Sequence, residues 1–197
     1  RRQRQMCIRD SYWIDSIKND RTNYIEREDA TIRLYVKDLI GKANLEANIT
    51  FLNQTKTILT PVSVSGNDKI FEATFDVSEA NQNVETRNFT GYLTITFQGA
   101  TRIMNLSNTL NVYRIILTNC SSSSLSTTPA LTLYIKNEET DKSIINATVE
   151  ISINVWKTGE IVRNYAWSFF LQNTDNQSIC IYPSWAEYTI DAMIQYD

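Results

Sequence analysis

The sequence predicts an all-β protein made of two tandem β-sandwich domains. Apolar and polar residues alternate through most of the chain, and a period of two places one side of a strand on a core and the other side in water. Thr, Ile, Val and Tyr, which favour strands, are plentiful, whereas long runs with helical spacing are missing. A pair of strands near residue 30 also has a second copy about 100 residues later, and 197 residues suit two sandwiches of about 80–100 residues each.

The clearest pair of strands lies between Ala130 and Trp156. The segment Asn137–Lys142 in its middle is too polar to be buried and is rich in residues that bond their own backbone, so we predict a turn there. On both sides of this turn, every second residue is apolar: Leu131, Leu133 and Ile135 before it, and Val149, Ile151, Ile153 and Val155 after it. The pattern predicts two half-buried strands that form a hairpin-like pair.

The earlier copy of this pair begins near residue 30. Leu34–Asp38 aligns with Leu133–Asn137, and after a shorter turn Ala43–Glu46 aligns with Ala147–Glu150. Apolar residues alternate in the same phase in both copies. A duplicated module is the simplest interpretation, although any two antiparallel hairpins share part of such a pattern.

The run Glu139–Val149, ETDKSIINATV, resembles the opening of carboxypeptidase-regulatory-like and other transthyretin-like domains. In those domains an acidic turn, an Ile or Pro-Ile pair, a small residue, Ala and a β-branched residue lead into the second strand. Residues 38–45 resemble an abbreviated version, whereas Ile144, Ile145 and Asn146 stand where the family often has Pro and Gly. The resemblance implies a seven-strand Greek-key sandwich that serves as a spacer or binding module outside the cell. An immunoglobulin-like sandwich is the alternative fold.

Four segments follow from these patterns. Residues 1–29 form a non-native leader followed by a linker or edge segment, because RRQRQMCIRDS at residues 1–11 resembles a translated sequencing-adaptor remnant of the kind found in metagenome assemblies. Residues 30–117 form the first sandwich module. Residues 118–129, TNCSSSSLSTTP, form a Ser/Thr-rich linker or wide loop. Residues 130–197 form the second module, which we expect to be truncated at its C-terminus.

Further strands complete both modules. The first module has alternating strands at residues 71–77 and 93–97, a strand from residue 103 onward and a closing strand at residues 110–117, with a polar loop at residues 78–88. In the second module Lys157–Glu160 is typical of a hairpin turn. Strands then follow at residues 165–171, 179–182 and 188–196, with a polar loop at residues 172–177.

The cysteines indicate an oxidising compartment. Once Cys7 is excluded with the leader, Cys120 and Cys180 remain, and a disulfide between them would close a loop of about 60 residues and stabilise the fold by roughly 3–4 kcal/mol. The alternative is two buried, reduced thiols in a cytosolic protein. We favour the disulfide, because the glycosylation motifs indicate secretion independently.

Seven N-x-S/T motifs occur, whereas about four are expected by chance from 19 Asn in a chain of this composition. A sequence rich in Asn and Thr for reasons of codon usage would also raise this number. Asn119 is a poor acceptor, because the middle residue of its motif is Cys120. The glycosylation candidates are therefore Asn48, Asn53, Asn88, Asn105, Asn146 and Asn176.

Several kinds of chemistry are excluded by composition. The chain has no His, which removes His-activated nucleophiles and His-ligated metal sites, and its five Gly form no phosphate-binding loop. Glu138, Glu139 and Asp141 cluster, but as a solvated turn rather than as a glycosidase pair or a regular calcium loop. We expect neither a cofactor nor a metal.

Three aromatic residues could stack against a sugar ring: Trp156, Tyr182 and Trp185. Trp156 falls on the polar side of its strand, and the other two flank Pro183 in a loop. Buried Trp is nevertheless commoner in a sandwich core. Exposure of Trp156 and Trp185 on one flat face would favour sugar binding.

The sequence therefore predicts a non-catalytic glycoprotein fragment, located outside the cell or on its surface, that acts as a stalk, adhesin or envelope structural module. The alternative is a carbohydrate-binding accessory module of a larger secreted enzyme. We expect other cell-surface proteins or glycans as partners, bound through loops or a sheet edge. Outside the first ten residues 15 basic side chains face 21 acidic ones, which is no footprint for nucleic acid, and no stretch approaches the ~20 apolar residues of a membrane span.

Overall fold

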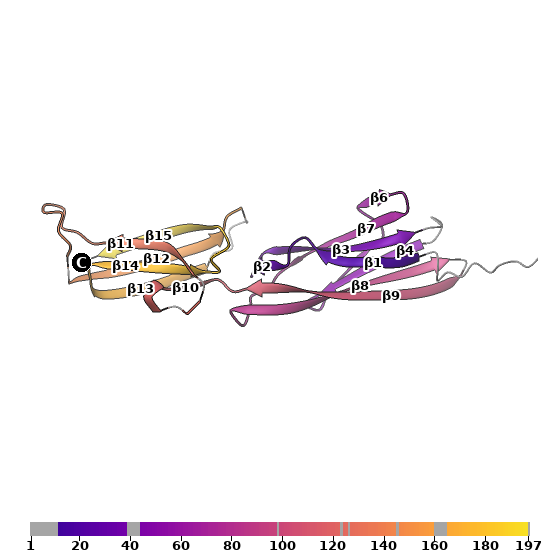
Figure 1. Ribbon diagram of the computed structural model, residues 1–197, viewed down its shortest axis with the longest axis horizontal. Coiled ribbons are helices and arrows are strands. Elements are labelled where there is room, and N and C mark those ends of the chain that lie inside the picture. Colours follow the sequence, from indigo (N-terminus) through magenta and orange to yellow (C-terminus); the bar gives the residue numbers. More distant parts are fainter. Residues whose placement is uncertain are drawn as a thin grey trace, which may run out of the picture. The chain divides into compact units, whose positions relative to one another are not determined.

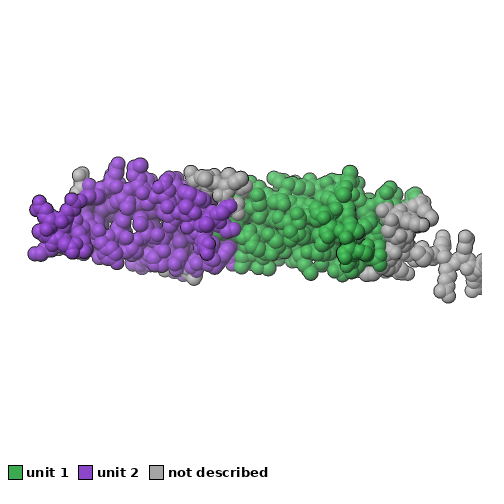
Figure 2. All heavy atoms as spheres, turned by 90° about the horizontal axis from the view of Figure 1, so that it is seen from above, with its two compact units in different colours: residues 1–78, 84–112 green, residues 79–83, 113–197 purple. Residues whose placement is uncertain are grey.

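The computed structural model describes residues 12–38, 44–97, 99–122, 124–125, 127–144, 146–159 and 165–196. Within these ranges strands account for nearly all regular structure and no α-helix occurs, which confirms the predicted all-β class (Figure 1). The Greek-key connectivity remains a prediction. The chain forms two compact units, which Figure 2 colours separately: unit 1 comprises residues 1–78 and 84–112, and unit 2 comprises residues 79–83 and 113–197.

Unit 1 contains two antiparallel sheets. One has the order β1-β3-β7-β6 and the other the order β2-β9-β8-β4-β5. The strands are β1 (Tyr12–Asn19), β2 (Asn23–Ile25), β3 (Asp29–Asp38), β4 (Asn44–Phe51), β5 (Gln54–Ile58), β6 (Ser63–Ser65), β7 (Asp68–Asp76), β8 (Val84–Phe97) and β9 (Ala100–Tyr113).

The core of unit 1 lies between its two sheets. Alternate residues are buried along β3 and through most of β4, β7 and β8, as the alternation of the sequence predicts. Phe51 of one sheet meets Phe75 of the other edge to face, with ring centroids 5.9 Å apart. Gly91 marks the closest approach, because a Cβ there would stand 2.6 Å from Ile17 Cδ1 and 2.8 Å from Leu34 Cδ1. These contacts make unit 1 a sandwich of two packed sheets.

Unit 2 is built from shorter sheets, with the orders β10-β14-β11 and β13-β12-β15. Its buried side chains lie mainly on β12 and β14, the central strand of each sheet. The elements are β10 (Ile116–Asn119), the 3₁₀ turn η2 (Cys120–Ser122), β11 (Thr128–Tyr134), β12 (Ala147–Lys157), β13 (Tyr165–Thr174), β14 (Asn176–Tyr182) and β15 (Tyr188–Tyr196).

The predicted hairpin-like pairs are wrong in their pairing. β3 and β4 lie in different sheets of unit 1, and β11 and β12 lie in different sheets of unit 2. The polar turn is present, since Asn137 N donates to Lys142 O at 2.8 Å and Lys136 forms an isolated bridge with Ser143. A period of two fixes which side of a strand is buried but not which strand lies beside it. The chain therefore crosses between sheets in both copies.

Three polar segments predicted as linker or loop contain parts of strands. Within residues 78–88, residues 84–88 belong to β8. Within residues 118–129, Thr118 and Asn119 belong to β10, and Thr128 and Pro129 belong to β11, and both strands flank β14. Within residues 172–177, only Asp175 separates β13 from β14. Polar side chains do not prevent backbone pairing when they face solvent, so these strands lack the apolar alternation that identifies buried ones.

The segment before residue 30 contains the first strands of unit 1. The predicted edge segment is observed at residues 12–19, because among the described residues β3 is the one strand that pairs with β1. The predicted hairpin of β12 and β13 is present as an antiparallel pair from Ala147↔Thr174 to Val155↔Tyr165. Glu160 of its predicted turn, Cys7 and the leader at residues 1–11 lie outside the described residues.

Candidate functional site

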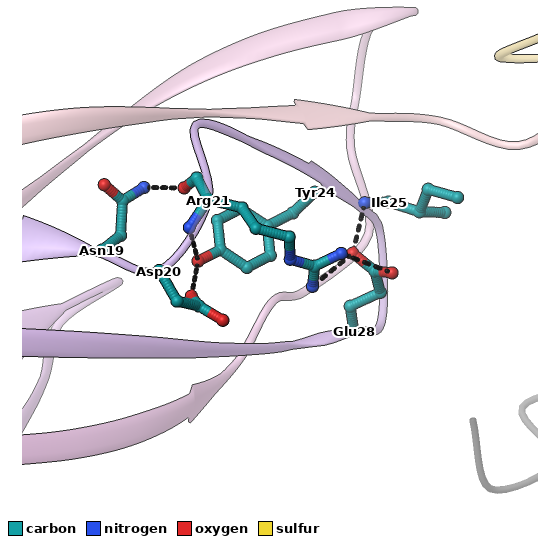
Figure 3. Close-up of polar contacts among 6 residues, drawn as sticks. All are labelled: Asn19, Asp20, Arg21, Tyr24, Ile25 and Glu28. Atoms are coloured by element: carbon teal, nitrogen blue, oxygen red, sulfur yellow. Dashed lines mark hydrogen bonds and ion pairs between the residues drawn. The ribbon is translucent and has the colours of Figure 1, made fainter. Parts of the chain in front are cut away.

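A cluster of polar side chains surrounds Tyr24 at the start of unit 1. Tyr24 lies in β2 and is fully buried. Its hydroxyl donates to the Asp20 carboxylate and accepts a hydrogen bond from the backbone N–H of Arg21 at 3.3 Å (Figure 3). The Asn19 side-chain amide donates to the carbonyl oxygen of Arg21. The Tyr24 hydroxyl is therefore hydrogen-bonded to two residues of the turn between β1 and β2.

Glu28 holds the other end of this cluster. Its side chain is 2% exposed, and Oε2 accepts a hydrogen bond from the backbone N–H of Ile25 at 2.8 Å. The Arg21 guanidinium donates to both carboxylate oxygens, at 3.3 and 3.5 Å, and lies over the Tyr24 ring with 4.6 Å from Cζ to the centroid (Figure 3). A buried carboxylate is tolerated when it is paired and hydrogen-bonded in this way.

Burial raises the pKa of the Tyr24 phenol well above its usual value, and the hydrogen bond to Asp20 raises it further. The phenol is consequently a neutral hydrogen-bond donor at physiological pH and is not poised to act as a base or nucleophile. The hydrogen bonds of the cluster link the β1–β2 turn to β2 and Glu28.

Raising the pH should weaken unit 1 through Tyr24. Above the unfolded pKa of about 10 the unfolded chain loses this proton while the folded chain keeps it, so stability falls by about 1.4 kcal/mol per pH unit until the folded pKa is reached. Urea unfolding of unit 1 between pH 9 and pH 11, followed for the wild type and for Tyr24→Phe, checks this. The variant should be less stable at pH 9 but lose less stability with rising pH. Parallel slopes for the two proteins would contradict the assignment.

Cys120 and Cys180, the predicted disulfide partners, are bonded to each other, with Cα atoms 4.9 Å apart and a sequence separation of 60. Cys120 begins η2 directly after β10, and Cys180 lies in β14, opposite Thr118 of β10. The bond therefore joins the end of one edge strand to the central strand of the same sheet. It ties the turn after β10 to the central strand.

Five of the six glycosylation candidates are exposed. They are Asn53, Asn88, Asn105, Asn146 and Asn176. Asn53 lies at the tip of the β4–β5 hairpin with a φ of 62°. Asn48 differs, since it lies half-buried in the middle of β4 with its amide bonded to Glu46 and Thr57. The five exposed positions could carry a glycan without displacing a packed side chain.

The three aromatic candidates lie in different environments. Trp185 is 47% exposed and meets Tyr113 edge to face, with centroids 5.4 Å apart. Tyr182 is 8% exposed and packs against the same Tyr113 at 6.1 Å, so its ring is not available to a ligand. Trp156 is half-buried on β12 opposite Thr189. Of the three candidates, Trp185 is the most exposed.

The acidic turn is an internal hydrogen-bonded structure. Asn137 Oδ1 accepts from the backbone N–H groups of Glu139 and Thr140 at 3.0 and 2.9 Å, and Lys136 pairs with Asp141 at 2.9 Å. Among the described residues, no group of three acidic, His or Cys side chains is placed to hold a metal ion. In the same residues, no helix has the length and hydropathy needed to cross a membrane.

The Tyr24 cluster could not be located from the sequence. It falls in residues 12–29, a mixed-charge segment that is compatible with a linker, an edge strand or a helix. The available signal was the spacing of Asp20, Arg21 and Glu28 around the apolar pair Tyr24 and Ile25. Charged residues close in sequence to an apolar pair predict such a cluster only when the chain is known to turn there.

No family model and no curated protein matches the chain. Among solved structures, similarities of 11% identity are found to a DUF4785 family protein from Legionella pneumophila (TM-score 0.36), a β-glucuronidase from Bacteroides uniformis (0.25) and a collagen adhesin from S. aureus (0.23). They cover 91%, 91% and 92% of this chain and 46%, 29% and 95% of those chains, respectively. The chain thus spans less than half of the first two proteins. TM-scores of this size carry no argument about function.

Proposed function

We propose that this chain is a non-catalytic structural module of a secreted or cell-surface glycoprotein, used as a stalk, adhesin or envelope building block. The observation that carries the proposal is the disulfide between Cys120 and Cys180. Disulfides persist in oxidising compartments and are rare in the cytosol. The bond stabilises the smaller of the two strand frameworks, that of unit 2.

The exposed N-x-S/T motifs support the same compartment. Asn53 and Asn146 lie in turns and Asn176 opens β14, positions at which a bulky hydrophilic glycan meets solvent rather than a core. The absence of His from the whole sequence removes the commonest general acid–base group at neutral pH. Partners would then meet loops or an unpaired sheet edge.

Expression in two redox environments tests this proposal. Protein exported to an oxidising compartment should contain the Cys120–Cys180 bond and resist limited proteolysis across unit 2, whereas protein kept in a reducing cytosol should be cleaved there. A Cys7→Ser background removes the remaining thiol without touching the pair. Equal resistance of the reduced and oxidised proteins would remove the argument for an extracellular role.

A second candidate function, sugar binding, is favoured by one observation, the exposed ring of Trp185. A Trp ring with one open face can stack on the apolar face of a pyranose. Titration of Trp fluorescence with soluble polysaccharides should then give saturable binding in the wild type that is lost in Trp185→Ala. Phe170→Ala is the matched control, because Phe170 is 59% exposed elsewhere on unit 2. Binding that survives in Trp185→Ala, or no binding by the wild type, would eliminate this candidate.

A further inference from the structure

β15, the last strand that the structure describes in unit 2, has no described strand beside its outer side. β15 pairs with β12 along its whole length, from Val149↔Tyr196 to Lys157↔Tyr188. It is also the end strand of its sheet, so that among the described residues no strand pairs with its other side. Its outer backbone N–H and C=O groups are therefore a template for another strand.

The same strand leaves core-type side chains open to solvent. On β12, Val149 and Ile151 are 1% exposed. Their partners on β15 share the same face of the sheet, yet Tyr196 is 67% exposed and Ile194 is 39% exposed. These two side chains line a cavity of about 300 Å³, which Leu133 and Val149 also line. The inner face of the sheet is thus uncovered where β15 forms the edge.

The sequence of β15 is nearly symmetric about its centre, Ala192. Reading outward from that residue, Ile190 matches Ile194, and Tyr188 matches Tyr196. Thr189 and Gln195 are both polar. An antiparallel strand of the same sequence would consequently place like residues on the same face and opposite one another.

We propose that β15 pairs antiparallel with β15 of a second copy of this chain, with Ala192 opposite Ala192. Such an interface has two-fold symmetry and closes after two copies. It joins the sheets of the two copies into one continuous sheet, with Tyr196 opposite Tyr188 and Ile194 opposite Ile190. Both inner faces lie on the same side, so the exposed apolar side chains cover one another.

The charge of Asp191 disfavours one alternative register. Asp191 is the only charged residue of β15, and the strand lacks the Lys and Pro residues that commonly protect an edge from pairing. In the register centred on Ala192, Asp191 faces the uncharged Met193, whereas a register centred on Asp191 would place two carboxylates opposite each other. If one β15 strand were shifted by a single residue relative to the other, its apolar side chains would lie on the opposite side of the joined sheet from those of its partner.

Cysteine cross-linking in a Cys7→Ser background tests the register. Opposed residues of an antiparallel pair have Cα atoms about 4.5–5.5 Å apart, within disulfide range, so Ala192→Cys should give a covalent dimer on mild oxidation. Gln195→Cys is the matched control on the same strand, because its two copies would lie about 20 Å apart. Ser152→Cys, which is exposed on the central strand β12, is the second control. Equal cross-linking of all three, or none at Ala192→Cys, would overturn the proposal.

Sedimentation of the uncut chain provides the second readout. The wild type should show a reversible monomer–dimer equilibrium in a dilution series, which Ile194→Lys should abolish while leaving the circular dichroism spectrum unchanged. Two Asp191 side chains would lie diagonally across the interface, about 7–8 Å apart, so Asp191→Asn should tighten dimerisation by about two-fold. A wild type that stays monomeric, or a dimer unaffected by Ile194→Lys, would show that β15 is not the interface. This inference is independent of the extracellular role.

Discussion

Replacing Phe75 with alanine is expected to lower the free energy of unfolding of unit 1 by about 3–5 kcal/mol, the usual cost of deleting a buried aromatic ring. Phe75 lies on β7, is 1% exposed and contacts Phe51 of the opposite sheet edge to face. Lys56 Nζ also lies over its ring, 5.1 Å from the centroid. The variant therefore leaves a cavity between the two sheets and removes a contact that joins them.

Urea denaturation of the Phe75→Ala variant, followed by circular dichroism, measures this loss. The matched control is Phe170→Ala in unit 2, which truncates a ring that is 59% exposed and should change stability by less than about 0.5 kcal/mol. A loss below about 1 kcal/mol for Phe75→Ala would mean that the two sheets of unit 1 do not pack through this ring.

Removing the disulfide with the double variant Cys120→Ala/Cys180→Ala is expected to destabilise unit 2 by about 3–4 kcal/mol, because the bond closes a long loop in the unfolded chain. Unit 2 is the more sensitive one, since several inward side chains of β13 and β15 are only partly buried. Calorimetry should show the unfolding transition of unit 2 moving to lower temperature while that of unit 1 stays in place.

Reduction of the wild type is the control for this double variant. Added reductant should shift the wild-type transition by a similar amount and leave the variant unchanged. A transition of unit 1 that moves with the disulfide, or a wild type that is insensitive to reductant, would contradict the assignment of the bond to unit 2.

Inward faces were predictable from the sequence, and pairing partners were not. Val149, Ile151, Ile153 and Val155 are all buried on β12, as their spacing predicts. The prediction that β12 pairs with β11 was wrong, since β12 pairs with β13 and β15. The alternation of apolar residues predicts which face of a strand is buried. The order of strands in a sheet depends on contacts between segments that are distant in the sequence.

Close approaches were also hidden from the sequence. Gly91 interrupts an otherwise regular alternation, and only the structure shows that Ile17 and Leu34 from the other sheet occupy the space its side chain would need. The exposure of Trp185 and the burial of Tyr182, two aromatic residues of the same short segment, likewise depend on the packing of Tyr113. By contrast, once Cys7 was set aside, Cys120 and Cys180 were the two cysteines left to pair, and the N-x-S/T motifs favoured a disulfide over reduced thiols.

The redox state of Cys120 and Cys180 in protein secreted into the medium tests the account most directly. Thiol alkylation without reductant, followed by digestion and mass analysis, should find one pair of peptides joined through these two residues and no label on either. If both residues carry the label in a folded, secreted protein, the bond is absent. That result would contradict the argument for placing this chain outside the cell.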